Sequence, residues 1–283
     1  MPSITTRELS ATDIPLGMRL KSEAGWNQTL GDWQRVLTLD PHGSFVGQLD
    51  GVDVGTVATV HFGPIGWIGL MLVDASTRGK GVGKQLMQVA IDYLEGCGVT
   101  SIRLDATPLG QPLYERLGFV AEYPLARFAG RPSANPVQSS FVPEVVTLAA
   151  LDDMAALDRQ VTQTDRRPLL ESLFIGNPPL SGVCRSGGHL TGYLLSRPGA
   201  NATQIGPCLA VDTATGAALL EYALDRMVGE PVYVDIPDVN EIARAMVERR
   251  GLTIQRPLLR MTRGKLVGEQ SQLIWSTFGP EKG

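Results

Sequence analysis

The stretch WIGLMLVDASTRGKGVGKQLMQVAIDYL, residues 67–94, decides the fold predicted for this chain. It begins with a nearly continuous apolar run at 67–73, passes through a loop with three glycines, and continues with apolar residues at helical spacing. Backbone N–H groups at the start of a helix lack partners and lie at the positive end of its dipole, so they bind anions. The stretch therefore predicts a buried strand, a phosphate-binding loop and a helix in direct succession.

Two common nucleotide-binding motifs do not fit this loop. A Walker A motif requires a glycine five residues before the Gly83-Lys84 pair and a serine or threonine after it, where the chain has Arg78 and Gln85. A dinucleotide-binding G-x-G-x-x-G motif also fails, because neither Gly-x-Gly start leads to a third glycine at the required position. A glycine-rich turn without a ligand is the remaining alternative, and the cations Arg78, Lys80 and Lys84 disfavour it.

The bulk composition narrows the class of protein. A length of 283 residues favours two domains. The net charge of -4 and the pI of about 5.5 argue against a nucleic-acid or anionic-membrane partner. Three cysteines without C-x-x-C spacing predict a reducing compartment, no metal site and no disulfide framework. Because we find no signal peptide and no apolar run of roughly 18 residues, we expect a cytoplasmic protein.

Hydrophobic periodicity and turn residues predict an α+β fold with a mixed sheet. We expect strands near 3–9, 44–49, 53–62, 67–73 and 99–105, and helices across 13–40, from the glycine loop to about 95, and at LGQPLYERLGF. The segment 129–143 is rich in Pro, Ser and Gly and predicts a linker. It would separate a first domain, residues 1–128, from a second domain, residues 144–283.

The segment VDASTRGKGVGKQL resembles the acyl-CoA pyrophosphate loop of the GNAT N-acetyltransferase superfamily, R/Q-x-x-G-x-G/A, at Arg78, Gly81 and Gly83. The proline that often follows the strand in this family is Ala75 here. The resemblance implies that loop amides hold the pyrophosphate of acetyl-CoA and that the preceding strand hydrogen-bonds its pantetheine arm. The implied cofactor-binding residues are Met71, Leu72, Val73, Arg78, Gly79, Lys80, Gly81, Val82, Gly83, Lys84 and Thr107.

A second motif, PLYERLGFVAEYP, resembles the L-Y-x-x-x-G-F segment of the same family. The resemblance implies that Tyr114 is the catalytic acid, which protonates the departing thiolate, a suitable role for a phenol that is neutral at pH 7. A tyrosine that only packs in the core is the alternative. The Asn-x-x-Ala that often precedes this tyrosine is Thr107 and Gly110 here, so Thr107 would take the place of the asparagine.

The second half repeats this pattern without the charged loop. LAVDTATGAALLEYAL resembles the strand, loop and helix of the first half, and NEIARAMVERRGLTIQRP aligns with TPLGQPLYERLGFVAEYP. Eight residues separate Asp74 from Gly83, but only three separate Asp212 from Gly216, and Val247 occupies the tyrosine position. We therefore expect two tandem GNAT-like domains, each a twisted sheet flanked by helices, of which the second is degenerate and not catalytic.

The use of this second half is left open by its sequence, and chance similarity between two αβ segments is the alternative. It could close the acceptor pocket, form a homodimer or bind a ligand of its own. The tail 272–280 carries Trp275 and Phe278. We expect it to end as a packed strand or to reach toward the pocket of the first domain.

The acceptor site and the general base are less constrained. The family resemblance places the acceptor site between the first two helices, where Trp26 and Asn27 are the substrate-lining candidates; Trp33 is expected to pack in the core. The base, which must deprotonate an amine that is mostly charged at pH 7, has no single assignment. The residues weighed for this role are Glu23, Asp40, His42 and His61.

Taken together, the motifs predict an acetyl-CoA-dependent N-acetyltransferase that acetylates a primary amine of a small molecule or amino acid. Transfer is expected to be direct, in a ternary complex, because no cysteine lies near the motifs to carry an acyl group. The alternatives are a non-catalytic acyl-CoA sensor and an enzyme that acetylates proteins. No nucleic-acid or membrane partner and no metal are expected, and a homodimer is one prediction for the assembly.

Overall fold

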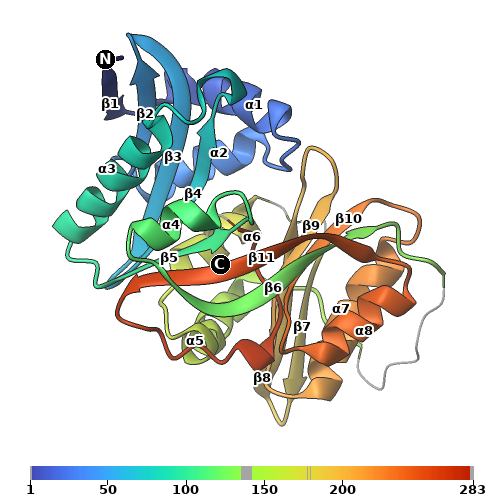
Figure 1. Ribbon diagram of the computed structural model, residues 1–283. Helices are drawn as coiled ribbons and strands as arrows, with labels where there is room; N and C mark the ends of the chain where they lie inside the picture. The colour runs from blue at the N-terminus through green and yellow to red at the C-terminus, as the bar shows by residue number, and fades with distance from the viewer. Residues whose placement is uncertain (1, 135–141, 177, 179, 281–283) are drawn as a thin grey trace.

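The computed structural model describes residues 2–134, 142–176, 178 and 180–280. Across these residues, twelve strands form one continuous mixed sheet in the order β1-β2-β3-β4-β5-β11-β6-β10-β9-β8-β7, with β12 paired to β9. The first half of the chain lies at one end of this sheet and the second half at the other (Figure 1).

The first half contains the elements that its sequence predicts and one further strand, Val120–Gly130, that it does not predict. They are β1 (Ile4–Glu8), α1 (Ile14–Glu23), α2 (Leu30–Leu39), β2 (Ser44–Leu49), β3 (Val52–Phe62), β4 (Ile65–Val73), α3 (Val82–Gly96), β5 (Ser101–Ala106), α4 (Gln111–Arg116) and β6 (Val120–Gly130). The strand, glycine loop and helix predicted at 67–94 are β4, the loop 74–81 and α3, which confirms this part of the interpretation.

The second half repeats this order from its first helix onward. Its elements are α5 (Leu151–Thr162), α6 (Arg167–Ile175), β7 (Ser181–Ser186), β8 (His189–Arg197), β9 (Thr203–Ala210), α7 (Thr213–Arg226), β10 (Val232–Pro237), α8 (Glu241–Arg249), β11 (Thr253–Gly264) and β12 (Ile274–Ser276). The repeat α-α-β-β-β-α-β-α-β agrees with the tandem arrangement predicted from sequence. The tail contains a short packed strand, β12, which was one of the two placements expected for it.

The predicted linker is described only in part. Residues 129–130, which were expected to begin it, are the last residues of β6, and residues 135–141 lie outside the described part of the chain. The boundaries 1–128 and 144–283 stay a prediction.

Each half places one strand beside strands of the other half. Strand β11, from the second half, pairs antiparallel with β5 on one side and with β6 on the other. Strand β6, from the first half, pairs antiparallel with β10. Both strands cross the middle of the molecule side by side (Figure 1). Backbone hydrogen bonds therefore join the halves into one sheet, whereas the sequence patterns predicted a sheet in each half.

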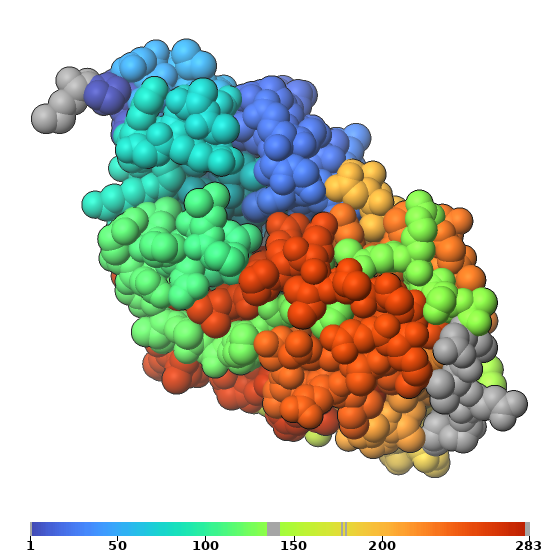
Figure 2. Space-filling view, turned by 45° about the vertical axis from the view of Figure 1, so that its right-hand side comes forward, coloured from blue at the N-terminus to red at the C-terminus, as the bar shows by residue number. Residues whose placement is uncertain are grey.

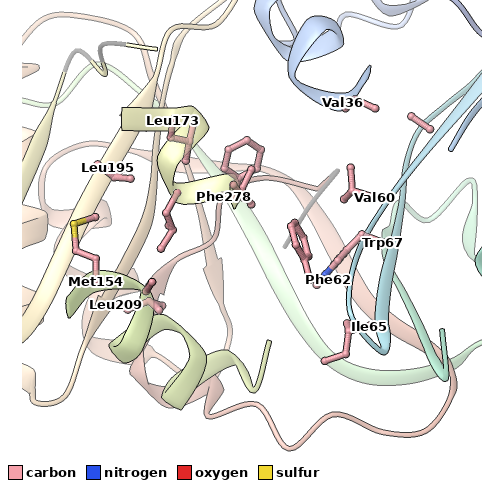
Figure 3. Packing of buried hydrophobic residues seen from close by; sticks show 14 of the residues in the cluster. Val36, Val60, Phe62, Ile65, Trp67, Met154, Leu173, Leu195, Leu209 and Phe278 are labelled. Atoms are coloured by element: carbon pink, nitrogen blue, oxygen red, sulfur yellow. The ribbon is translucent and has the colours of Figure 1, made fainter. Parts of the chain in front are cut away.

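The hydrophobic core continues across the junction. One cluster contains Val60 and Trp67 of the first half together with Leu195, Leu209 and Phe278 of the second. Figure 3 shows the labelled residues of the two halves facing one another from opposite sides of this cluster. Because apolar burial is the main stabilising term in folding, the shared cluster makes each half depend on the other.

A buried ionic network lies at the same junction. Arg260 of β11 donates to both carboxylate oxygens of Asp105 in β5, at 2.8 and 2.9 Å. Arg103 and the Tyr123 hydroxyl donate to Glu269 at 2.6 and 2.7 Å, and Arg260 lies 3.2 Å from the same carboxylate. Glu269, from the segment after β11, thus contacts cations from both halves.

Within the described ranges, no helix is both long enough and apolar enough to span a membrane.

Candidate active site

A cavity of about 600 Å³ lies where β4 separates from β5. This volume is in the range that small-molecule sites occupy. Its wall contains residues 68–73 of β4, part of the glycine loop, α4, and the connection between α1 and α2. The rest of the wall comes from β5 and the segment after it, from β6, from β11 and from residue 280, so both halves of the chain contribute.

The separation of β4 from β5 leaves one strand edge open. Among the described residues, the two strands pair in parallel only from Ile65 with Ser101 to Trp67 with Arg103. Beyond Trp67 the β4 residues line the cavity instead. Leu70, in the left-handed region with φ of 49°, marks a bulge at this point. An unpaired strand edge presents N–H and C=O groups that an extended ligand can pair with as an added strand.

The glycine loop opens directly onto helix α3. Gly79 and Gly81 have φ of 77° and 95°, which only glycine adopts without strain. Gly81 is the N-cap of α3 and has no side chain to satisfy the N–H groups of the first turn. The helix start is therefore open to an anion.

The loop residues predicted to bind the cofactor divide into two groups. Those in the wall of the cavity are Arg78, Gly79, Val82 and Gly83, and Met71, Leu72, Val73 and Thr107 join them there. Lys80, Gly81 and Lys84 are exposed beside the cavity and lie outside its described wall. The Arg78 Nε donates to the Val73 carbonyl at 3.2 Å, which holds its guanidinium at the end of β4.

Tyr114, the predicted catalytic acid, lies in the wall of the cavity. Its half-buried ring packs edge-on against Phe119, with centroids 6.1 Å apart. The ring also covers Gly110, where a Cβ atom would come within 2.8 Å of Cε2 and 3.1 Å of the hydroxyl oxygen. Burial raises the pKa of Tyr114 to about 12, so the phenol keeps its proton at neutral pH.

The two acceptor-site candidates separate in the structure. Trp26 lines the cavity, whereas Asn27 is buried and belongs to the contact between the halves. The Asn27 Nδ2 donates to the Ala202 carbonyl at 2.9 Å, and its Oδ1 accepts from the backbone N–H groups of Asn201 and Ala202. Gln28, the next residue, lies in the wall instead. Trp33 is buried in the core, as expected.

The candidates for the general base are also spread apart. Glu23 lines the cavity and pairs with Arg19 at 2.7 Å. Asp40 accepts a hydrogen bond from Tyr93 at 2.6 Å, and His61 lies 3.9 Å from Asp40. His42 pairs with Glu8 on the surface. Asp40, His42 and His61 are all outside the described wall of the cavity.

Sequence reasoning missed several residues of the wall. They are Gln28, Asp105, Arg127, Arg256, Leu258 and Pro280. Asp105 is engaged by Arg260 through both of its oxygens. The last four come from the exchanged strands and the tail, and no local motif could have found them, because only the tertiary arrangement of these segments brings them to this cavity.

Comparison with known families agrees with the geometry. The model of the acetyltransferase (GNAT) family matches residues 13–119, and the model of a further acetyltransferase (GNAT) domain matches residues 154–276. The chain therefore belongs to the GNAT acetyltransferases, with two such domains in tandem, and it is an N-acetyltransferase. Enzymes of this family use acetyl-CoA.

The chain is also similar to individual proteins over most of its length. It is 26% identical to holothin acyltransferase from Pseudoalteromonas sp. (strain SANK 73390), over 85% of this chain and 81% of the relative. It is 28% identical to the uncharacterized N-acetyltransferase YitH from Bacillus subtilis (strain 168), over 78% and 77%.

Solved structures share the fold of the whole chain. A putative acetyltransferase from Pyrococcus horikoshii superposes with a TM-score of 0.84 at 20% identity, covering 99% of this chain and 96% of that one. A tandem GNAT protein from the clavulanic acid biosynthesis pathway gives a TM-score of 0.65 at 16% identity, covering 93% and 98%.

Proposed function

We propose that the first half transfers the acetyl group of acetyl-CoA directly to a primary amine of a small molecule or amino acid. One observation carries the proposal: an open strand edge, an uncapped helix start and a half-buried phenol border the same cavity. The name of the holothin acyltransferase, which refers to a specific compound, supports a small molecule over a protein as acceptor.

The residues around the cavity fit the chemistry of acetyl-CoA. The N–H groups at the start of α3 suit the pyrophosphate, and Arg78, Lys80 and Lys84 add positive charge around it. The open edge of β4 at Met71 and Val73 suits the amide-containing pantetheine arm. Thr107, at the end of β5, lines the same space.

Tyr114 would act as the general acid of the transfer. The amine nitrogen bonds to the carbonyl carbon as the C–S bond breaks, and the Tyr114 hydroxyl gives its proton to the leaving sulfur. The amine nitrogen loses one proton in the same reaction, so solvent restores the phenol and the protons balance. Among the four residues that could act as the base, Glu23 borders the cavity, and the base itself stays unassigned.

Direct transfer agrees with the positions of the cysteines. Cys97 is exposed just beyond the C-terminal end of α3, and Cys184 and Cys208 are buried in the second half. None of them is in the described wall of the cavity, so no thiol is placed to carry an acyl group.

The test is release of free thiol from acetyl-CoA in the presence of a panel of small amines, amino acids and peptides. We expect release with at least one small amine. Release with peptides alone would favour a protein acceptor, and binding of acetyl-CoA without release with any acceptor would favour a sensor.

A further inference from the structure

The second half contains the same strand separation as the first. Strands β9 and β10 pair in parallel from Thr203 with Val232 to Ile205 with Val234, the same number of residue pairs as between β4 and β5 in the described chain. In the first half, the space beyond this point is the cavity. In the second half, the chain's own tail occupies it.

Backbone pairing holds the tail in this second groove. Strand β12 lies antiparallel to β9, with Ile274 opposite Leu209 and Ser276 opposite Cys208. The Thr277 N–H donates to the Asp235 carbonyl of β10 at 2.8 Å, so the tail contacts both separated strands. β12 thus adds to β9 as a pantetheine arm would add to the open edge of β4.

The start of α7 is closed as well. Asp212 accepts a hydrogen bond from the Thr215 N–H at 2.8 Å and puts a negative charge where the first half leaves the helix open. The ring of Trp275 lies so close to Gly216 that a Cβ atom there would fall 1.9 Å from it. Gly83, which aligns with Gly216, borders the cavity instead. An anion has no place at α7.

From this groove the tail continues to the first half. Phe278 is fully buried in the cluster that joins the halves, and the Arg197 guanidinium lies 5.3 Å from its ring centroid. Two residues later, Pro280 forms part of the wall of the cavity that Tyr114 and β4 also line. Figure 2 shows the red-orange part of the second half directly against the green surface of the first half.

We propose that residues 274–277 are a built-in occupant of the second groove and that this anchoring makes Pro280 a specificity-determining residue for the acceptor. The degenerate half then does not bind acetyl-CoA. Its fold positions a piece of its own chain as one wall of the catalytic half's cavity. The role of Pro280 rests on the proposed function; the anchoring does not.

Calorimetry with acetyl-CoA tests the occupied groove. We expect one binding site for each chain. Two sites would overturn the inference, because the second groove would then accept the cofactor, and no binding at all would overturn the proposed function.

Hydrogen exchange provides a test that needs no ligand. Trp275→Ala should speed exchange of the amides at 208–210 at least tenfold and leave exchange at 68–73 unchanged. Unchanged exchange at 208–210 would contradict the anchoring.

Substitutions at residue 280 test whether this part of the cavity wall determines acceptor preference. The quantity measured is the ratio of KM for bulky amines to KM for the smallest accepted amine. Pro280→Trp should raise this ratio at least tenfold, and Pro280→Ala should lower it. KM for acetyl-CoA should stay within twofold. Leu266→Trp, the same replacement at an exposed position outside the described wall, is the control.

Disrupting the pairing of residues 274–277 in the second groove should also change acceptor preference, although these residues lie outside the described cavity wall. Thr277→Pro removes the N–H that bonds to Asp235 and should shift acceptor preference in the direction of Pro280→Ala. If it fails to fold, Trp275→Ala is assayed the same way. An active enzyme whose acceptor preference is the same in all these variants would overturn the role of Pro280 while leaving the proposed function intact.

Discussion

Tyr114 keeps its proton because its ring is packed against Phe119 and over the backbone of Gly110. The same packing holds the ring in the wall of the cavity that β4 borders. At the scale of single residues, the proposed chemistry therefore depends on one phenol and on the glycine beneath it.

Tyr114→Phe removes the proton donor and keeps the ring. We expect kcat to fall by about 10²- to 10⁴-fold, the usual contribution of a general acid, with acetyl-CoA affinity changed less than twofold. Because the raised pKa of about 12 keeps the phenol neutral, titration of Tyr114 should cause no loss of wild-type kcat below about pH 11. Steady-state kinetics and calorimetry measure both quantities, and weaker cofactor binding at unchanged kcat would contradict the role.

Gly110→Ala tests the position of the same ring. The added Cβ would lie 2.8 Å from Tyr114 Cε2, so the ring must move and kcat should fall at least tenfold at unchanged acetyl-CoA affinity. Gly96→Ala is the matched control, because a Cβ there meets nothing within 4 Å and φ is ordinary. Equal kcat values for the two variants would show that the ring position does not matter.

At the scale of elements, the loop 74–81 and the first turn of α3 form one unit. Gly79 and Gly81 supply the left-handed turns that bring the chain onto the helix start, and Asp74 fixes the beginning of the loop. Hydrogen bonds from Ser76 and Arg19 lower the pKa of Asp74 to about 2. The loop is thus held at both ends while its amides stay open to a ligand.

Arg78→Ala should weaken acetyl-CoA binding and leave chemistry at saturation nearly unchanged. The lost interaction is a charge-assisted one at the surface, so we expect a five- to tenfold rise in Kd, or about 1–1.4 kcal/mol. Arg226→Ala, an exposed arginine on α7, is the control. Calorimetry at two salt concentrations should show the difference shrinking at high salt, and a fall in kcat at unchanged Kd would contradict this role.

At the scale of the whole molecule, exchanged strands and a shared core bind the halves together. Glu269 lies at the centre of the ionic network between them. Burial alone would raise the pKa of Glu269, but the charges of Arg103 and Arg260 outweigh it and lower this pKa to about 2. The carboxylate of Glu269 therefore stabilises the fold at every pH at which it is ionised.

Glu269→Gln should lower the free energy of unfolding by about 3–5 kcal/mol at pH 7, because two buried cations lose their shared partner. The depressed pKa means that this contribution is complete above the usual value near 4.5 and is lost as the pH falls toward 2. Urea unfolding at pH 7 and pH 3 should show the gap to wild type narrowing. Glu171→Gln, at an exposed pair, should change little at either pH.

Local sequence determined much of this protein. The apolar run at 67–73, the glycines after it and the helical spacing that follows are properties of adjacent residues, and they specified the strand, the loop and α3. The motif around Tyr114 likewise identified a residue that the structure places in the cavity wall. The spacing also predicted a shorter loop in the second half, and in the structure this loop leads directly to α7, whose start is capped by Asp212.

Only the tertiary structure decided how the halves are joined and what else lines the cavity. The position of Asn27 between two helices predicted a lining residue, but its amide donates to the carbonyl of Ala202, 175 positions away in the chain. Arg127, Leu258 and Pro280 reach the cavity through the strand exchange and the anchored tail. Periodicity sets which face of an element is buried, whereas the strand that pairs with an open edge is set by competition among distant segments, which local sequence does not encode.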